Sequence, residues 1–260
     1  MTDSGEHLSC SVIVPCRNEV DNVEQLVERL PRVGSSTELI FVDGGSTDGT
    51  PDRIEEVMRR YPQRDIKLLK QNGRSGKGEA VFQGFDAATG DILIILDADM
   101  AVRPEDLPRF YDALVTGQGD FANGTRFRLR MESRAMPGLN NLGNRAFALL
   151  FSWVLSVRIT DTLCGTKALF KRDWFAISRA RTYFGYHDPW GDFDLLLGAS
   201  WSGLRIVEVP VAYRARVAGE SKMQPLRHGL ALAKTYLTGA WRLKVRKPTR
   251  SSRDSTHRNI

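Results

Sequence analysis

Short apolar runs alternate with amphipathic segments along residues 1–100. The runs with the length of a buried strand lie at 11–15, 38–42, 66–69 and 92–96. The segments with apolar residues at helical spacing lie at 23–30, 51–60 and 79–88. Repeated alternation of strand and helix is typical of a parallel sheet with right-handed crossovers. The pattern therefore predicts an α/β fold with a mostly parallel sheet flanked by helices.

The alternation continues to residue 241 with longer apolar segments. Further strands are predicted at 121–124, 168–170 and 205–211. Further helices are predicted at 105–114, at 146–157, after the loop 189–194, and over 226–241. We therefore expect a single domain over 8–224, a basic amphipathic helix over 225–247 and a disordered basic tail over 248–260.

The segment 146–157 is the longest apolar stretch, and Arg145 and Arg158 flank it. A membrane-spanning helix needs about 20 apolar residues, so this segment is too short to span. A core helix is the favoured interpretation, and a helix lying at a membrane interface is the alternative.

The run Ile92 to Leu96 ends in Asp97-Ala98-Asp99. Open α/β sheets bind their ligands at the carboxyl ends of buried strands. Two carboxylates there need partners, and a divalent cation that also binds phosphate oxygens supplies one. Mg²⁺ and Mn²⁺ favour such oxygen ligands. A solvated loop after the strand is the alternative.

Other polar residues lie at the ends of predicted strands or at the starts of predicted helices. Asp43 ends the second strand, where it can accept hydrogen bonds from a base or ribose. Lys77 lies in a glycine-rich loop at a predicted helix start, which favours anions. Arg126 has the fork geometry that binds diphosphate, with an exposed loop as the alternative. Asp192 and Asp194 form a second carboxylate pair.

The net charge of +6 is unevenly placed. Residues 222–260 hold ten Lys and Arg and one Asp, which gives +9 there and leaves −3 for the rest. Anionic lipid, nucleic acid or solvent alone could face such an end. The three cysteines lack metal or redox spacing, and no signal peptide is seen, so we expect a reduced, cytoplasmic compartment.

Four motifs in order, VIVPCRNE, FVDGGSTDGT, GKGEAV and ILDADM, resemble the nucleotide-sugar half of a family 2 glycosyltransferase with the GT-A (Rossmann-like) fold. The later stretches DTLCGTKALF, WGDFDLLL and VPVAYRARVAGESK are similar to the polyprenyl-phosphate branch of that family. This branch includes dolichyl-phosphate mannose synthases and dolichyl-phosphate glucosyltransferases. The resemblance covers about residues 10–224, and the order of the motifs makes it more specific than any one of them.

The resemblance implies a role for each matching residue. The base and ribose pocket would be lined by Pro15, Arg17, Glu19 and Asp43, with Lys77 near the nucleotide. Asp97 would face ribose and metal, and Asp99 would ligate the metal. The residues implied to close over the diphosphate and the acceptor phosphate are Arg126, Arg214, Arg216, Ser221 and Lys222. Asp194, or Asp192, would stand at the acceptor side.

Two positions depart from the family pattern. The mannose synthase pattern DADLQ has Ala101 at its last position here, so a third metal ligand of that type is missing. The usual DDGS is DGGS, and Gly44 supplies no second acid.

The resemblance implies an inverting, metal-dependent transfer of a hexose from a nucleotide sugar, of the GDP-mannose or UDP-glucose type, to a polyprenyl phosphate. Mg²⁺ or Mn²⁺ would be the cofactor, and the basic amphipathic helix would bind an anionic membrane surface peripherally, on the cytoplasmic face. Because a lipid phosphate is already anionic, no strong base is then needed. A hydroxyl acceptor would need one, and Asp194 or Asp192 is the candidate.

Two alternatives stay open. The first is the same chemistry on a soluble glycan or small-molecule hydroxyl, and the second is an inactive module that binds sugar nucleotides. A dehydrogenase is excluded because no GxGxxG follows the first strand. Nucleic-acid binding is disfavoured because no aromatic platform accompanies the basic tail.

Overall fold

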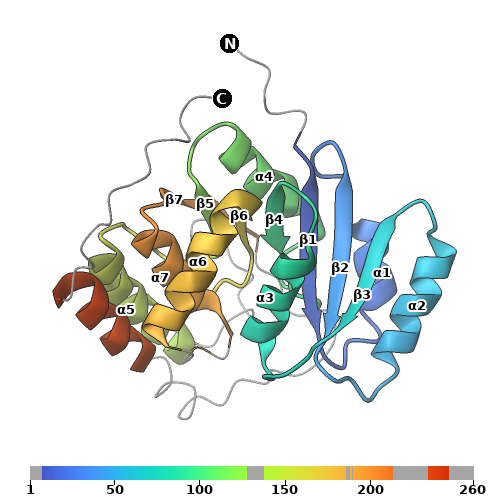
Figure 1. The fold of residues 1–260 in the computed structure, drawn as a ribbon, viewed down its shortest axis with the longest axis horizontal. Coiled ribbons are helices and arrows are strands. Elements are labelled where there is room, and N and C mark those ends of the chain that lie inside the picture. Colours follow the sequence, from blue (N-terminus) through green and yellow to red (C-terminus); the bar gives the residue numbers. More distant parts are fainter. Residues whose placement is uncertain (1–7, 128–137, 186–187, 189, 213–233, 246–260) are drawn as a thin grey trace.

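The structure, a computed structural model, describes residues 8–127, 138–185, 188, 190–212 and 234–245. Its centre is a seven-stranded sheet with the strand order β3-β2-β1-β4-β6-β5-β7 (Figure 1). The strands are β1 (Cys10–Cys16), β2 (Thr37–Asp43), β3 (Asp65–Lys70), β4 (Ile92–Ile95), β5 (Phe121–Thr125), β6 (Lys167–Phe170) and β7 (Ile206–Pro210). Only β6 runs antiparallel to its two neighbours, so the sheet is mostly parallel.

Helices cover both faces of this sheet (Figure 1). They are α1 (Val23–Arg29), α2 (Thr50–Arg60), α3 (Lys77–Ala87), the 3₁₀ turn η1 (Pro104–Asp106), α4 (Leu107–Val115), α5 (Gly138–Leu155), α6 (Lys171–Phe184), α7 (Asp192–Trp201) and the π-helical turn η2 (Trp241–Val245), which continues a helix over 234–240. No helix in the described part of the chain is long and apolar enough to cross a membrane.

Alternation along the buried strands separates two cores. Val12 and Val14 of β1 point to the face that α1, α2 and α4 cover, whereas Ile13 points to the face of α3, α5, α6 and α7. Strand β4 is buried on both sides, which explains why Ile92 to Ile95 reads as an unbroken apolar run. The predicted α/β class and all seven predicted strands are confirmed, with ends shifted by at most one residue.

Two helical segments differ from the expectation. Helix α6 was not predicted, although Trp174, Ile177 and Phe184 are buried at helical spacing. Helix α5 begins earlier than predicted, and it is not fully inside the core, because Phe151 is buried while Trp153 is exposed. The amphipathic residues of 225–247 are described only from 234 to 245, and the tail 248–260 lies outside the described residues, so these domain bounds stay predictions.

The sheet topology brings distant segments to one edge. Strands β1 to β5 and β7 share one direction, so their carboxyl ends lie at the same edge of the sheet. Antiparallel β6 starts at that edge, which places the preceding loop, 161–166, there as well. Parallel sheets bind ligands at this edge, so the candidate residues from the sequence lie where a site is expected.

Candidate active site at the carboxyl edge of the sheet

The centre of the edge is an ion pair between Lys77 and Asp97. Asp97 follows β4, and Lys77 is the first residue of α3, with its Nζ 2.6 Å from Asp97 Oδ1. Burial alone would lower the pKa of Lys77, but the carboxylates of Asp97, Asp192 and Asp99 outweigh it and raise that pKa. The ammonium therefore stays charged, at a helix start that itself favours anions.

Gly165 makes this pair possible from a third segment. It lies in the loop that precedes β6, directly against the pair. A Cβ on Gly165 would stand 2.5 Å from Lys77 Nζ and closer still to Asp97 Oδ2. Only a residue without a side chain leaves both groups in place, which gives the CGT motif a steric reason.

Asp99 supplies the second carboxylate of the DAD motif. Its Oδ1 accepts a hydrogen bond from the Ala101 amide at 3.1 Å, which tightens the turn after β4. Within the described residues, no three His, Cys, Asp or Glu side chains come together as a complete metal site. Mg²⁺ is commonly held by one or two carboxylates while substrate phosphates and water fill its other positions. Asp97 and Asp99 fit a cation that binds together with a diphosphate.

The loops that follow β1 and β2 are joined to each other by hydrogen bonds. The carboxylate of Asp43 accepts hydrogen bonds from the amides of Gly45 (3.1 Å) and Ser46 (3.2 Å) and from the Ser46 hydroxyl. Asn18 Oδ1 accepts from the Thr47 amide, and the Asn18 amide donates to Ser46 Oγ, both at 2.9 Å. Asn18 was missed by the sequence analysis, although the carboxyl end of a strand was the signal to follow.

The predicted nucleotide residues lie on these loops. Pro15 is the residue of β1 that pairs with Val42, and Arg17 and Glu19 follow that strand. Glu19 Oε2 accepts a hydrogen bond from Asn22 Nδ2 at 2.8 Å. Their contact with a base or ribose stays a prediction.

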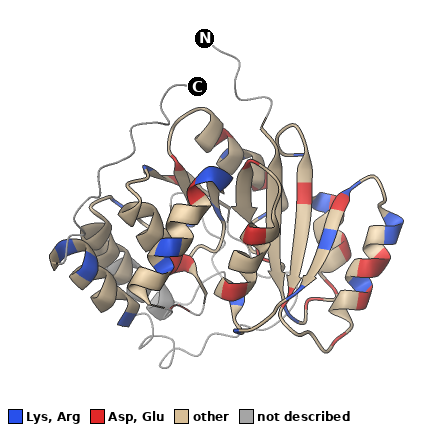
Figure 2. Cartoon of the chain, in the orientation of Figure 1, with Lys and Arg blue, Asp and Glu red and all other residues tan. Residues whose placement is uncertain are grey.

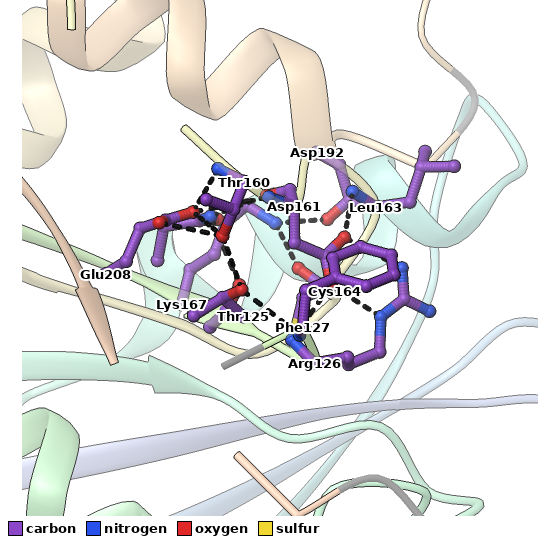
Figure 3. Close-up of polar contacts among 12 residues, drawn as sticks. Thr125, Arg126, Phe127, Thr160, Asp161, Leu163, Cys164, Lys167, Asp192 and Glu208 are labelled. Atoms are coloured by element: carbon purple, nitrogen blue, oxygen red, sulfur yellow. Dashed lines mark hydrogen bonds and ion pairs between the residues drawn. The ribbon is translucent and has the colours of Figure 1, made fainter. Parts of the chain in front are cut away.

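Arg126 follows β5 and is buried, which differs from an exposed loop. Its Nε and Nη2 donate to Asp161 at 2.6 and 2.8 Å, and its backbone amide donates to Asp161 Oδ2 at 3.1 Å (Figure 3). Such a bidentate pair fixes the plane of the guanidinium. The predicted contact of Arg126 with diphosphate remains a prediction.

Glu208 of β7 holds the loop that carries Asp161. Its Oε1 accepts from the Thr160 amide at 2.6 Å and from the Asp161 amide at 3.2 Å (Figure 3). Thr125 and Thr160 share a hydrogen bond of 2.7 Å between their hydroxyls. Asp161 and Glu208 were missed as site residues, because their partners come from elements far away in the sequence.

Asp192 and Asp194, the candidate bases, lie in the first turn of α7 and both carry ion pairs. Asp192 Oδ1 accepts from Lys167 Nζ at 2.6 Å, and that lysine is fully buried in β6 (Figure 3). Asp194 Oδ2 accepts from Arg181 Nε at 2.9 Å, and the same guanidinium donates twice to Glu79 of α3 at 3.0 Å. Arg181 therefore ties α3, α6 and α7 together.

Burial raises the pKa of Asp194 to about 7, with the nearby Asp188 carboxylate adding to the rise and Arg181 opposing it. Burial, with Asp192 adding, also raises the pKa of Asp188 to about 6. Asp194 forms a salt bridge with Arg181 of α6. The predicted acceptor residues Arg214, Arg216, Ser221 and Lys222 lie outside the described residues.

Comparison with known proteins identifies relatives of this chain. The model of the family described as "Glycosyl transferase family 2" matches residues 11–177. A dolichol-phosphate mannosyltransferase from Pyrococcus furiosus is 28% identical over 84% of this chain, and the match spans only 60% of that protein. A dolichyl-phosphate hexose transferase from Haloferax volcanii is 30% identical over 87% of this chain and 92% of its own length.

A solved structure shares the fold. Glucosyl-3-phosphoglycerate synthase from Mycobacterium tuberculosis, crystallised with Mn²⁺, UDP and glucosyl-3-phosphoglycerate, superposes with a TM-score of 0.65 at 22% identity. The match covers 91% of this chain and 80% of that one. It confirms the predicted GT-A architecture of the domain.

Gly165→Ala should weaken the binding of a nucleoside diphosphate without lowering the stability of the fold. The added methyl displaces only the flexible ends of Lys77 and Asp97, so we expect the melting temperature to change little. We expect affinity for a nucleoside diphosphate to fall roughly tenfold or more, about 1.4 kcal/mol. Calorimetric titration with UDP and GDP, alongside thermal unfolding, measures both effects. Unchanged affinity would place nucleotide binding away from this pair.

Asp194 should make folding stability depend on pH in an uncommon direction. Its folded pKa of about 7 lies above the ordinary value of 3.8, so the folded chain binds a proton that the unfolded chain lacks between these values. The free energy of unfolding should therefore rise from pH 8 to pH 5 by on the order of 2 kcal/mol more than in Asp194→Asn. Urea unfolding of both proteins at the two pH values measures this, and parallel profiles would contradict it.

Proposed function

Because the chain belongs to glycosyl transferase family 2, we propose that it transfers a hexose from a nucleotide sugar to a polyprenyl phosphate, with inversion at the anomeric carbon. The observation that carries this proposal is the convergence of the Lys77 ammonium with the carboxylates of Asp97 and Asp99 at the carboxyl edge. This set combines an anion-binding cation with cation-binding oxygens. Together they suit a nucleoside diphosphate that binds with a divalent cation.

Charge stabilisation is the chemistry that this edge supplies. As the glycosidic bond breaks, negative charge grows on the departing nucleoside diphosphate, and the fixed Lys77 ammonium offsets it. Asp97 and Asp99 would hold Mg²⁺ or Mn²⁺, which when bound acts as a Lewis acid on the diphosphate. The Mn²⁺ and UDP named with the Mycobacterium tuberculosis synthase support such a cation, and in this chain its use remains part of the proposal.

The donor would lie along the loops after β1 and β2. We assign Pro15, Arg17, Glu19 and Asp43 to the side of the base and ribose. Hydrogen bonds hold these loops in place, because the Asp43 carboxylate accepts from the amides of Gly45 and Ser46 in the same turn. Donors of the UDP-glucose and GDP-mannose types both remain within the proposal.

A phosphate acceptor is favoured by the state of the candidate bases. Asp192 is paired with Lys167, and Asp194 is paired with Arg181, so neither is a solvated carboxylate facing a substrate hydroxyl. A polyprenyl phosphate needs no deprotonation near neutral pH and requires only positioning. Both relatives described above are named for dolichyl or dolichol phosphate, which supports the same acceptor class.

Cationic side chains would position that acceptor. We assign this role to Arg126, whose guanidinium plane Asp161 fixes. On sequence alone, the proposal adds Arg214, Arg216, Ser221 and Lys222 from the loop after β7. We place the reaction at the cytoplasmic face of a membrane. Cys10, Cys16 and Cys164 are buried and form no disulfide, which is compatible with a reducing compartment.

A product assay tests the proposal directly. Purified protein with Mg²⁺ or Mn²⁺, UDP- or GDP-sugars and a short polyprenyl phosphate should form a sugar lipid that extracts into organic solvent. Asp99→Ala should lower turnover by at least roughly 100-fold, since it removes charge stabilisation worth several kcal/mol. Asp112→Ala, on an exposed position of α4, is the matched control and should keep full activity. Nucleotide binding without lipid product would move the acceptor to a soluble hydroxyl or leave an inactive binding module.

Asp194→Asn distinguishes the two acceptor classes. With a polyprenyl phosphate we expect kcat to stay within about threefold of the wild type, because no proton has to be removed. With a hydroxyl acceptor, loss of a general base would cost on the order of 100-fold or more. Initial rates with both acceptors, together with the melting temperature of the variant, separate these cases. A severe loss with the phosphate acceptor in a folded variant would contradict the mechanism.

A further inference from the structure

Two helices lie together at one flank of the molecule, α5 and the segment 234–245 (Figure 1). The rings of Phe151 and Tyr236 meet at 5.7 Å in an edge contact. Lys244 Nζ donates to Ser156 Oγ at 2.5 Å just after α5 ends. The two helices therefore form one packed unit on the outside of the sheet.

Each helix buries one side and exposes the other. Phe151 and Val154 of α5 are buried, and Thr235 is buried on the second helix. The opposite sides are apolar as well, although they face solvent. Seven large apolar side chains are exposed among the described residues, and six of them are on these two helices: Leu149, Leu150, Trp153, Leu237, Trp241 and Val245. Such a concentration marks an interaction surface rather than scattered exposure.

The two exposed rows join into one face. Leu237, Trp241 and Val245 repeat every fourth residue along one side of their helix. Lys244, between Trp241 and Val245 in the sequence, lies over the Trp153 ring at 5.5 Å. This contact links the row on the second helix to the row on α5. We call these six residues the apolar face.

The charges around the apolar face have one sign. Arg158, Lys234, Arg242 and Lys244 lie on or beside the two helices, and residues 138–160 and 234–245 contain no Asp or Glu. In Figure 2 the segment 234–245 carries positions coloured for Lys and Arg and none coloured for Asp or Glu. A second copy of the same face would set cations against cations. Anionic lipid headgroups complement them, while the apolar rows enter the acyl boundary.

We infer that the apolar face binds an anionic membrane surface, with Trp153 and Trp241 at the level of the headgroups. Tryptophan prefers this level because its ring is apolar and its N–H is polar. The lysine and arginine stems extend over the same region and keep their charges in the headgroup layer. The inference deepens the membrane placement in the proposed function by naming the face that would contact lipid. Its test requires no turnover, so the two proposals can fail separately.

Vesicle sedimentation of the full chain tests the inference. Vesicles of phosphatidylcholine with phosphatidylglycerol should bind the wild type, and Trp153→Ser combined with Trp241→Ser should weaken binding about tenfold or more. The basic tail is present in both proteins, so the difference reports the apolar face. Phe175→Ser is the matched control, because Phe175 is 70% exposed but lies on α6, and its binding should equal that of the wild type.

A second variant tests the charge. Lys234→Gln combined with Lys244→Gln should weaken binding to phosphatidylglycerol vesicles by a smaller factor, and added salt should reduce this difference. Wild-type binding by the double tryptophan variant would overturn the inference, as would a dimer in light scattering that only the tryptophan substitutions dissociate. Binding that depends on both tryptophans, in a chain that forms no sugar lipid, supports this inference and contradicts the proposed function alone.

Discussion

The ion pair of Lys77 with Asp97 constrains the carboxyl edge of the sheet. Asp97 follows β4, which is buried on both faces, and Lys77 is the first residue of α3. The carboxylate raises the pKa of the Lys77 ammonium, and Gly165 must be small because it lies against both groups. The start of α3, the end of β4 and the loop before β6 therefore all meet at this one ion pair. A diphosphate would find a cation already in position there, without the cost of ordering one.

Three further buried ion pairs lie around this one. Arg126 holds Asp161, Lys167 holds Asp192, and Arg181 holds Asp194. Removing one partner of such a buried pair leaves an uncompensated charge, so each pair locks the elements that carry it. The locking holds Asp192 and Asp194 in ion pairs instead of leaving them mobile. An acceptor that arrives as an anion suits an edge built in this way.

Sequence patterns predicted the strands because buried parallel strands are apolar over their whole length, as Ile92 to Ile95 shows. They also predicted where Asp97 and Lys77 lie, since strand ends and helix starts are local features. They missed the partner of Arg126, because Asp161 reaches it through a loop that Glu208 of a distant strand holds. Pairing of this kind depends on tertiary contacts, which one sequence does not reveal. The unpredicted helix α6 is different, because its apolar spacing was visible.

Helix α5 shows why neither interpretation of its apolar sequence was complete. Its inner side stacks Phe151 on Phe193 of α7 at 4.3 Å, as a core helix does, while its outer side exposes Trp153. Helix α7 begins with Asp192 and touches the start of α3 where Gly191 meets Gly78. The outer apolar face and the Lys77 end of α3 are therefore joined through two packed helices. A membrane held at that face would contact helices that pack against one another, so this packing would set the orientation of the candidate site relative to the lipid surface.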